Sequence, residues 1–227
     1  MSALSARFGA LLFLLFGSSA AGKTFALNQL RGRVDDLAIH DFDEIGVPPR
    51  ADTAWRHDAD EQWLRRALEY QSEGTDLLLA GQTPFGELLA APSAPRLEAV
   101  SACLIDCDDQ TRIARLRARG PEWFARTAGE LQDYLNWAAW MRGHAVDPSW
   151  RTEVIRDDAT DDEMHWARLD GWRGDDPRWR VRVIDTTELP VEEVGARLLE
   201  WIAEERALLR AGTHPLSGAA LHNQGQA

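Results

Sequence analysis

With 227 residues, 44% of them hydrophobic and 27% charged, the chain has the size and composition of one globular α/β domain with a small insertion. Its formal net charge of −12 argues against a nucleic-acid partner, because phosphate backbones are bound by clustered Lys and Arg. Cys103 and Cys107 fit neither a metal-binding spacing nor a disulfide framework, so we predict buried thiols in a reducing, cytoplasmic compartment. The apolar run near the N-terminus superficially resembles a signal peptide but is too short to span a membrane.

Apolar runs of strand length alternate with segments of helical spacing along most of the chain. The run FGALLFLLF (8–16) is continuous and ends at Gly17, as expected for a central strand that helices cover on both faces. Further strands are predicted at 36–43, 76–81, 100–106 and 179–186, and helices at about 23–30, 59–72, 85–91, 108–119 and 191–209. This alternation predicts an α/β fold, with a five-stranded parallel sheet between two layers of helices.

The segment 120–179 breaks this rhythm and holds seven of the ten tryptophans. We predict helices at about 129–143 and 160–170, joined by loops that contain Pro and Gly. The segment is interpreted as a helical lid and acceptor-binding insertion within a single domain of residues 1–210. The tail 211–227 has no apolar periodicity and is predicted to be disordered.

Residues 17–24 read GSSAAGKT, a complete match to the phosphate-binding pattern G-x-x-x-x-G-K-[ST]. A buried strand is predicted before the motif and a helix after it, which is the context that this loop requires. The two glycines let the backbone curl so that its N–H groups surround phosphate oxygens at a helix N-terminus. The lysine can reach the β- and γ-phosphates of ATP, and the threonine hydroxyl can bind Mg²⁺. The predicted nucleotide-binding residues are Gly17, Ser18, Ser19, Ala20, Ala21, Gly22, Lys23, Thr24 and Phe25, with Lys23 also catalytic and Thr24 a metal ligand.

Two carboxylates, Asp41 and Asp43, stand at the end of the second predicted strand. The carboxyl ends of neighbouring parallel strands open onto one crevice, where ligands bind. One carboxylate can hold Mg²⁺ through water while the other accepts a proton from an acceptor hydroxyl. The alternative is structural, with Asp43 as a helix cap and Asp41 in solvent. We predict that Asp41 binds the metal and that Asp43 is catalytic and contacts the substrate.

Together, GSSAAGKT and this D-x-D resemble the shikimate kinase and gluconate kinase group, and the P-loop is especially similar to that of the chloramphenicol phosphotransferases. These are compact P-loop kinases with a five-stranded parallel sheet and a mobile lid. In shikimate kinases a D-x-D here serves the magnesium site and the acceptor, which implies the same for Asp41 and Asp43. The stretch 183–202 is similar to the final strand and helix of these kinases, where the connecting loop lies against the adenine. The resemblance therefore implies that Asp185, Thr186 and Thr187 lie near the nucleotide, although Thr187 can instead cap the last helix.

The predicted helix after the fourth strand is strongly basic, with Arg112, Arg115, Arg117 and Arg119. Phosphoryl transfer spreads negative charge over the γ-phosphate oxygens, which a guanidinium group can neutralise. Related kinases supply an arginine from this helix. Because they are four residues apart and share a helix face, Arg115 and Arg119 are predicted to be catalytic. Arg112 and Arg117 are predicted to lie in solvent.

Two features depart from the family pattern. The third strand ends in AGQ (80–82), where a metal-binding carboxylate often stands, so Gln82 is either an acceptor contact or a turn residue. The segment 120–179 matches no acceptor domain of these kinases. Trp55 and Arg56 lie where acceptors bind in this architecture and are predicted substrate contacts. The tryptophans of the insertion either pack in the core or wall a planar acceptor: Trp123, Trp137, Trp140 and Trp150.

These features predict a P-loop kinase that uses ATP and Mg²⁺ to phosphorylate a hydroxyl group of a small molecule. The acceptor classes left open are a nucleoside or nucleotide, a sugar or sugar acid, and an antibiotic. The alternative is a nucleotide-binding regulatory ATPase without a small-molecule acceptor. Such proteins usually carry a strong metal-binding acid after a central strand, which this sequence lacks. The expected partner is the acceptor, with no nucleic acid and no membrane, and a homodimer is left open.

Overall fold

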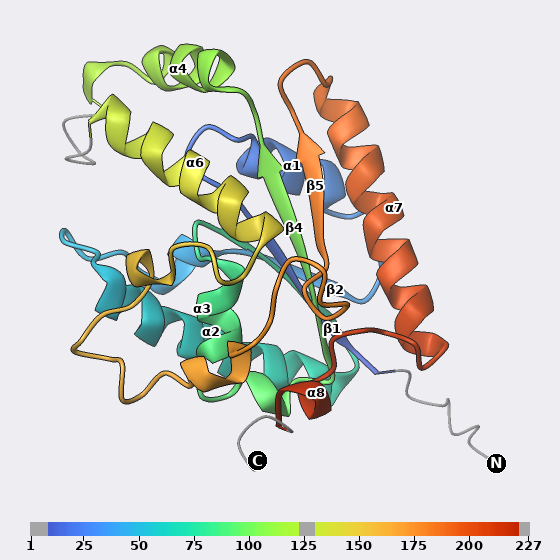
Figure 1. Cartoon of the computed structure of the whole chain (residues 1–227). Coiled ribbons are helices and arrows are strands. Elements are labelled where there is room, and N and C mark those ends of the chain that lie inside the picture. Colours follow the sequence, from blue (N-terminus) through green and yellow to red (C-terminus); the bar gives the residue numbers. More distant parts are fainter. Residues whose placement is uncertain (1–8, 123–129, 223–227) are drawn as a thin grey trace.

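The computed structural model describes residues 9–122 and 130–222 (Figure 1). Its centre is a five-stranded sheet in the order β2-β3-β1-β4-β5, and every neighbouring pair of strands is parallel. The strands are β1 (Leu11–Phe16), β2 (Leu37–Asp41), β3 (Asp76–Gly81), β4 (Ala99–Asp106) and β5 (Val181–Asp185). Strand β1 is buried at each of its residues because it has a strand on both sides and helices on both faces. The predicted parallel sheet is confirmed.

Alternate side chains of β1 point to opposite faces of the sheet and divide the core into two parts. Leu11, Phe13 and Leu15 pack with the helices α1 (Lys23–Leu30) and α7 (Val191–Arg210). Leu12, Leu14 and Phe16 pack on the other face, which is covered by α2 (Thr53–Glu73), α3 (Phe85–Ala90) and α6 (Leu131–Val146). The two helical layers are visible on either side of the sheet in Figure 1.

The insertion lies on the face of α2 and α3 and contributes much of that core. Trp140, Trp166, Trp172 and Trp179 are all buried there. Beyond α6, the described part of the insertion is built from turns and two short 3-10 helices, η3 (Thr152–Val154) and η4 (Trp166–Leu169). The helix predicted at 160–170 is therefore wrong except for this single turn, because large side chains dock in the core along an irregular backbone.

The disordered tail predicted from Ala211 is also wrong for the residues that the structure describes. Leu216 and Leu221 are 1% and 2% exposed. The backbone N–H of Val100 donates to the Leu216 carbonyl at 3.1 Å, and the segment ends in α8 (Gly218–His222). Buried leucines and hydrogen bonds to residues around the start of β4 order this segment, although it has no helical or strand periodicity.

The remaining short elements are η1 (Phe42–Ile45), η2 (Ala94–Arg96) and α4 (Asp109–Ala118). Helix α4 follows β4 and stands over the end of the sheet where the P-loop lies (Figure 1). No helix in the described ranges is long and apolar enough to cross a membrane.

Candidate active site

The loop after β1 needs its glycines for two different reasons. The N–H of Gly17 donates to the Gly81 carbonyl at 3.2 Å, and a Cβ at position 17 would lie 2.2 Å from the Ile105 carbonyl oxygen. No side chain fits there, because three strands crowd this point. Gly22 has φ 105°, a left-handed conformation that suits glycine, directly before α1 begins. The motif therefore specifies both close packing and a backbone turn at the helix N-terminus.

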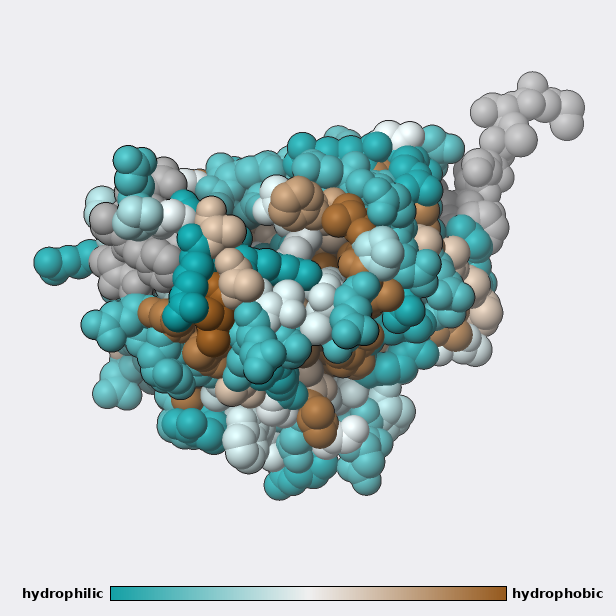
Figure 2. Space-filling view, turned by 90° about the horizontal axis from the view of Figure 1, so that it is seen from above, coloured by the Kyte–Doolittle hydropathy of each residue, from teal (hydrophilic) through white to brown (hydrophobic). Residues whose placement is uncertain are grey.

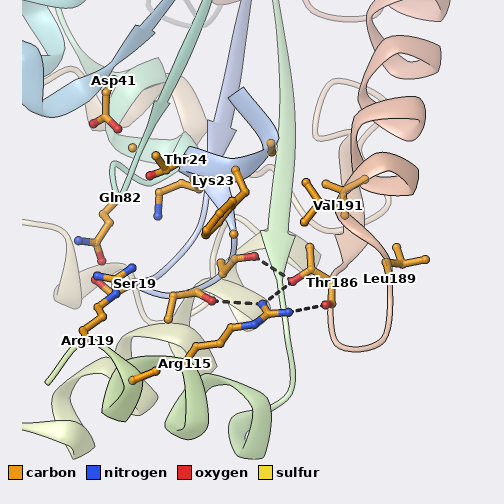
Figure 3. A pocket seen from close by; sticks show the side chains of 18 of the residues that line it. Ser19, Lys23, Thr24, Asp41, Gln82, Arg115, Arg119, Thr186, Leu189 and Val191 are labelled. Carbon is orange, nitrogen blue, oxygen red and sulfur yellow. Dashed lines mark hydrogen bonds between the residues drawn. The ribbon is translucent and has the colours of Figure 1, made fainter. Parts of the chain in front are cut away.

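A cavity of about 680 Å³ opens at this end of the sheet. Its walls come from the P-loop, the ends of β2 and β3, helix α4, and the loop between β5 and α7 (Figure 3). Figure 2 looks onto this end of the molecule and shows a mainly hydrophilic surface with hollows between side chains. Most of the residues predicted for the site line this cavity: Ser19, Ala20, Ala21, Gly22, Lys23, Thr24, Phe25, Asp41, Asp43, Gln82, Arg115, Arg119 and Thr186.

Lys23 lies at the centre of the P-loop and is held by the loop's own backbone. Its ammonium group donates to the carbonyls of Gly17 at 2.5 Å and Ser18 at 3.1 Å. Burial lowers the pKa of Lys23 to about 8, although the negative charges of Asp41 and Asp43 act in the opposite direction. The lysine therefore stays mostly protonated at neutral pH, and it is placed to attract phosphate oxygens.

Asp41 and Asp43 differ in what their carboxylates do. Asp41 caps η1, since its carboxylate accepts from the Asp43 N–H at 3.1 Å while Glu44 accepts from the Asp41 N–H at 3.0 Å. The capping residue is thus Asp41 and not Asp43, the reverse of the structural alternative. No donor in the described ranges hydrogen-bonds the Asp43 carboxylate. Partial burial and the nearby Asp41 raise the pKa of Asp43 above its ordinary value, with Lys23 opposing. These conditions suit a proton acceptor.

Thr24 and Asp41 line the same cavity and offer a hydroxyl and a carboxylate oxygen. Hard oxygen ligands of this kind suit Mg²⁺, which usually keeps several waters and binds phosphate oxygens with only one or two protein ligands. In the parts of the chain that the structure describes, no three His, Cys, Asp or Glu side chains form a metal site by themselves. The residues present therefore fit a magnesium ion that arrives with a nucleotide.

Arg115 and Thr186 join the P-loop to the loop that follows β5. The guanidinium group of Arg115 donates to the Thr186 hydroxyl at 2.9 Å, the Thr186 carbonyl at 2.7 Å and the Ala20 carbonyl at 3.3 Å (Figure 3). These donors are already used, so Arg115 holds the cavity wall together. The prediction that Arg115 contacts the transferred phosphate is not supported by this geometry. Arg119 lines the same cavity and extends toward Gln82 and Ser19 (Figure 3).

The loop after β5 places only one of its three predicted residues in the cavity. Thr186 is buried and lines it. Asp185 instead accepts from the N–H and hydroxyl of Thr187, and Thr187 accepts from the Asp108 N–H at 2.8 Å. These two residues shape the turn on its outer side and do not line the cavity. Thr187 does not cap α7 either, because that helix begins after Pro190. The apolar residues Leu189 and Val191 complete the wall.

Trp55 and Arg56 do not line the cavity either. The Arg56 guanidinium donates from Nε and Nη2 to the two carboxylate oxygens of the buried Glu87, each at 2.5 Å, and it lies over the Trp137 ring, 5.4 Å from the ring centroid. Trp55 packs edge-on against Phe42. In this structure their contacts are structural: Arg56 links α2 to α3 and α6, and Trp55 links α2 to η1.

The tryptophans of the insertion mostly pack in the core. Trp137 and Trp140 are stacked at 5.0 Å, Trp140 is buried, and Trp150 is 48% exposed beside Gly143. None of the three lines the nucleotide cavity. Trp123 lies outside the described residues. The core-packing alternative is thus confirmed for Trp140.

A cluster of contacts around Asp106, beneath the P-loop, was not predicted from the sequence; we call it the Asp106 clamp. Arg112 is fully buried and donates to the Ser19 carbonyl and to Asp106, so the prediction that it lies in solvent is wrong. Arg142 on α6 donates to the other Asp106 oxygen at 2.5 Å. The Ser18 hydroxyl also donates to the Tyr134 carbonyl on α6 at 3.0 Å. Asp106 ends its strand just as Asp41 does, which was an available signal, whereas nothing in the sequence marks Arg142.

Comparisons with known proteins show the fold of this chain and no closer relationship. No protein-family model matches the chain, and no curated protein does. Among solved structures, a sugar kinase from Janibacter sp. matches with a TM-score of 0.53 and 13% identity, over 88% of this chain and 98% of that one. A thymidylate kinase from Candida albicans matches with a TM-score of 0.49 and 10% identity, over 86% of this chain and 92% of that one. A gluconokinase from Sinorhizobium meliloti matches with a TM-score of 0.46 and 15% identity, over 92% of this chain and 99% of that one.

The likeness to the sugar kinase spans nearly the whole of both chains, and it confirms the three-layer fold of the P-loop kinases that the sequence resemblance implied. At 13% identity the likeness establishes the fold alone. The activity must be argued from the cavity and its residues.

Proposed function

We propose that this protein is an ATP-dependent kinase that transfers a phosphoryl group to a hydroxyl of a small molecule. The observation that carries the proposal is one cavity in which the P-loop with Lys23 faces the carboxylate of Asp43. A phosphate-binding loop alone serves many nucleotide-binding proteins. A carboxylate with a raised pKa in the same cavity adds a group that can take a proton from an acceptor.

When bound, ATP and Mg²⁺ supply the phosphoryl group and shield its charge. The backbone N–H groups of the P-loop and the Lys23 ammonium hold the phosphates in place. Asp43 accepts the proton of the acceptor hydroxyl, and Arg119 stabilises charge on the transferred group. Thr24 and Asp41 would hold the metal through their side-chain oxygens. The nucleotide base is expected against the apolar wall of Leu189 and Val191 beside Thr186.

The charge of the cavity favours a hydroxyl acceptor over a phosphate acceptor. Asp41 and Asp43 stand on the wall that faces the P-loop, and two carboxylates would repel a second phosphate group. A neutral hydroxyl also has a proton to lose, so a general base is useful to it. Nucleosides, sugars and antibiotics therefore remain in the acceptor panel. The name of the Janibacter protein is a reason to test sugars first.

The test is ATP turnover with an acceptor panel, for the native chain and for Lys23→Ala. The substitution should lower kcat by on the order of 10²–10³, because it removes one charge contact that forms with the transferred phosphate. The fold should persist, since among the described residues the Lys23 ammonium hydrogen-bonds only to carbonyls of its own loop. Circular dichroism and the melting temperature check this. Retained turnover in Lys23→Ala would exclude the P-loop from the mechanism. Phosphate release that no acceptor accelerates would favour a regulatory ATPase instead.

A further inference from the structure

A second cavity, of about 640 Å³, lies at the end of the molecule away from the P-loop. It is formed where η2, η4 and α8 meet near the start of β4. Figure 1 shows these segments at the lower end of the molecule, with the P-loop and α4 at the upper end. Pro95, Met164 and Leu221 provide an apolar part of its lining. The mechanism proposed above uses none of these residues.

The charge of this cavity is opposite to that of the whole protein. Arg96, Arg156 and Arg168 line it together with one acid, Asp161, while the chain carries a net charge of −12. Within the described ranges, no carboxylate lies within ion-pair distance of Arg96 or Arg156. Both arginines are exposed. Three arginines outnumber the single acid in this lining, and two of them have no carboxylate at ion-pair distance among the described residues, so the cavity attracts anions.

Arg168 is already used by the protein and gives the cavity a fixed positive charge. Its guanidinium donates to the carbonyls of Leu89 at 3.2 Å and Ala91 at 2.6 Å, at the end of α3. This interaction is structural, because the last carbonyls of a helix lack partners within the helix. The positive charge of Arg168 acts on His165, which lines the same cavity. Burial and Arg168 together lower the pKa of His165, and Glu61 opposes this shift.

Trp166 belongs to the lining of the same cavity. The Arg156 guanidinium lies over its ring, 5.2 Å from the ring centroid. The Trp166 side chain is buried, and its indole N–H has no acceptor within the described residues. A buried donor without an acceptor is destabilising and rare in native proteins. An anionic group close to both residues would balance the positive charge of Arg156 and would give the Trp166 indole N–H an acceptor.

We propose that this cavity binds a small organic anion, with a phosphate or carboxylate group held by Arg96 and Arg156 and an apolar or planar body against Pro95, Met164 and Trp166. The size of the cavity is suited to a metabolite-sized ligand. The site is separate from the nucleotide cavity and does not depend on the kinase proposal.

Isothermal titration tests the proposal with three probes: phenyl phosphate, benzoate and inorganic phosphate. All titrations use the native chain with a saturating non-hydrolysable ATP analogue, which occupies the P-loop, because the backbone N–H groups of that loop also bind phosphate. We expect one site that binds phenyl phosphate or benzoate more tightly than inorganic phosphate, because only the first two have an apolar body. A preference for phenyl phosphate over benzoate would identify a phosphomonoester ligand, and the reverse a carboxylate.

The matched variants are Arg96→Ala/Arg156→Ala and Arg197→Ala/Arg210→Ala, which remove the same charge from exposed positions in different places. The first pair should raise the Kd at least tenfold and the second should leave it unchanged. Arg156→Lys keeps the charge but loses the two-pronged geometry, so it should weaken phenyl phosphate binding. The melting temperature confirms that each variant is folded. No binding at millimolar probe, or equal loss in both double variants, would overturn the proposal.

Discussion

The two ends of the sheet are built in different ways. At the carboxyl end, a short continuous motif forms the P-loop, and loops directly after the strands supply Asp41, Gln82 and Thr186 to the cavity. At the amino end, the insertion and the final segment pack together through residues far apart in the chain. The Val100 N–H bonds to Leu216, and the His165 N–H bonds to Ala90. The residues of the carboxyl end are therefore placed by local sequence, whereas the structure of the amino end depends on contacts between distant segments.

The largest expected effect concerns the acidic pair at the carboxyl end. Asp43→Asn keeps the shape of the side chain but cannot accept a proton, so kcat should fall about 10²–10⁴-fold with little change in ATP affinity. In the native chain, activity should fall as the pH drops through the raised pKa of Asp43, because the base must be ionised. Steady-state kinetics across pH measures both.

Asp41→Asn is the matched comparison for Asp43→Asn. The loss of activity should appear as a weaker affinity for Mg²⁺, so that excess metal partly restores turnover, since Asp41 is placed toward the metal. Its cap on η1 should be largely kept, because the side-chain oxygen of an asparagine can also accept from the Asp43 N–H. Normal turnover in both variants would remove the acidic pair from the mechanism.

The Asp106 clamp connects α6 to the P-loop and can be tested by a single substitution. Asp106→Asn would leave the fully buried Arg112 without its counter-charge, so the free energy of unfolding should fall by about 3–5 kcal/mol. Asp109→Asn is the control, because the Asp109 carboxylate is 52% exposed and pairs only with Arg142. It should cost about 1 kcal/mol or less. Urea unfolding of both variants measures these free energies. Equal losses of stability in Asp106→Asn and Asp109→Asn would contradict a stabilising role for the Asp106 clamp.

The amino end is tested by Leu216→Ala. Because this side chain is 1% exposed in the core beside η2 and β4, its truncation should lower the free energy of unfolding by about 2–5 kcal/mol. Thr213→Ala, at an exposed position of the same segment, should change it by about 0.5 kcal/mol or less. If the two variants unfold at the same denaturant concentration, the segment does not contribute to the core.

The smallest expected effect is the pH dependence of ATP binding. Protonated Lys23 attracts phosphate, so the affinity should be constant below its pKa of about 8 and should decrease above it. The decrease is at most about tenfold per pH unit, because one proton is involved. Titration with a non-hydrolysable ATP analogue between about pH 7 and about pH 9.5 measures this dependence. Lys23→Arg, which stays charged, should remove it, and an unchanged pH profile in that variant would assign the titration to another group.

The sequence by itself determined the sheet, its helical layers and the nucleotide loop. These features depend on patterns between near neighbours: a buried strand reads as the continuous run LLFLLF, and GSSAAGKT contains the glycines that the turn requires. The position of Asp41 and Asp43 at the end of a parallel strand was enough to place both in the cavity. Each of these inferences needs only the secondary structure and the rule that parallel strands end at one edge.

Only the tertiary structure decided which arginines are buried, which tryptophans form core, and how the last residues are ordered. A charged residue on an amphipathic helix is predicted to be exposed unless its partner in the folded protein is known. The partner of Arg112 is the Asp106 carboxylate, which it shares with Arg142 on α6. Leu216 is ordered by a strand that precedes it by more than a hundred residues in the chain. Such contacts depend on the packing of distant segments, because burial is a property of the whole core and not of the local sequence.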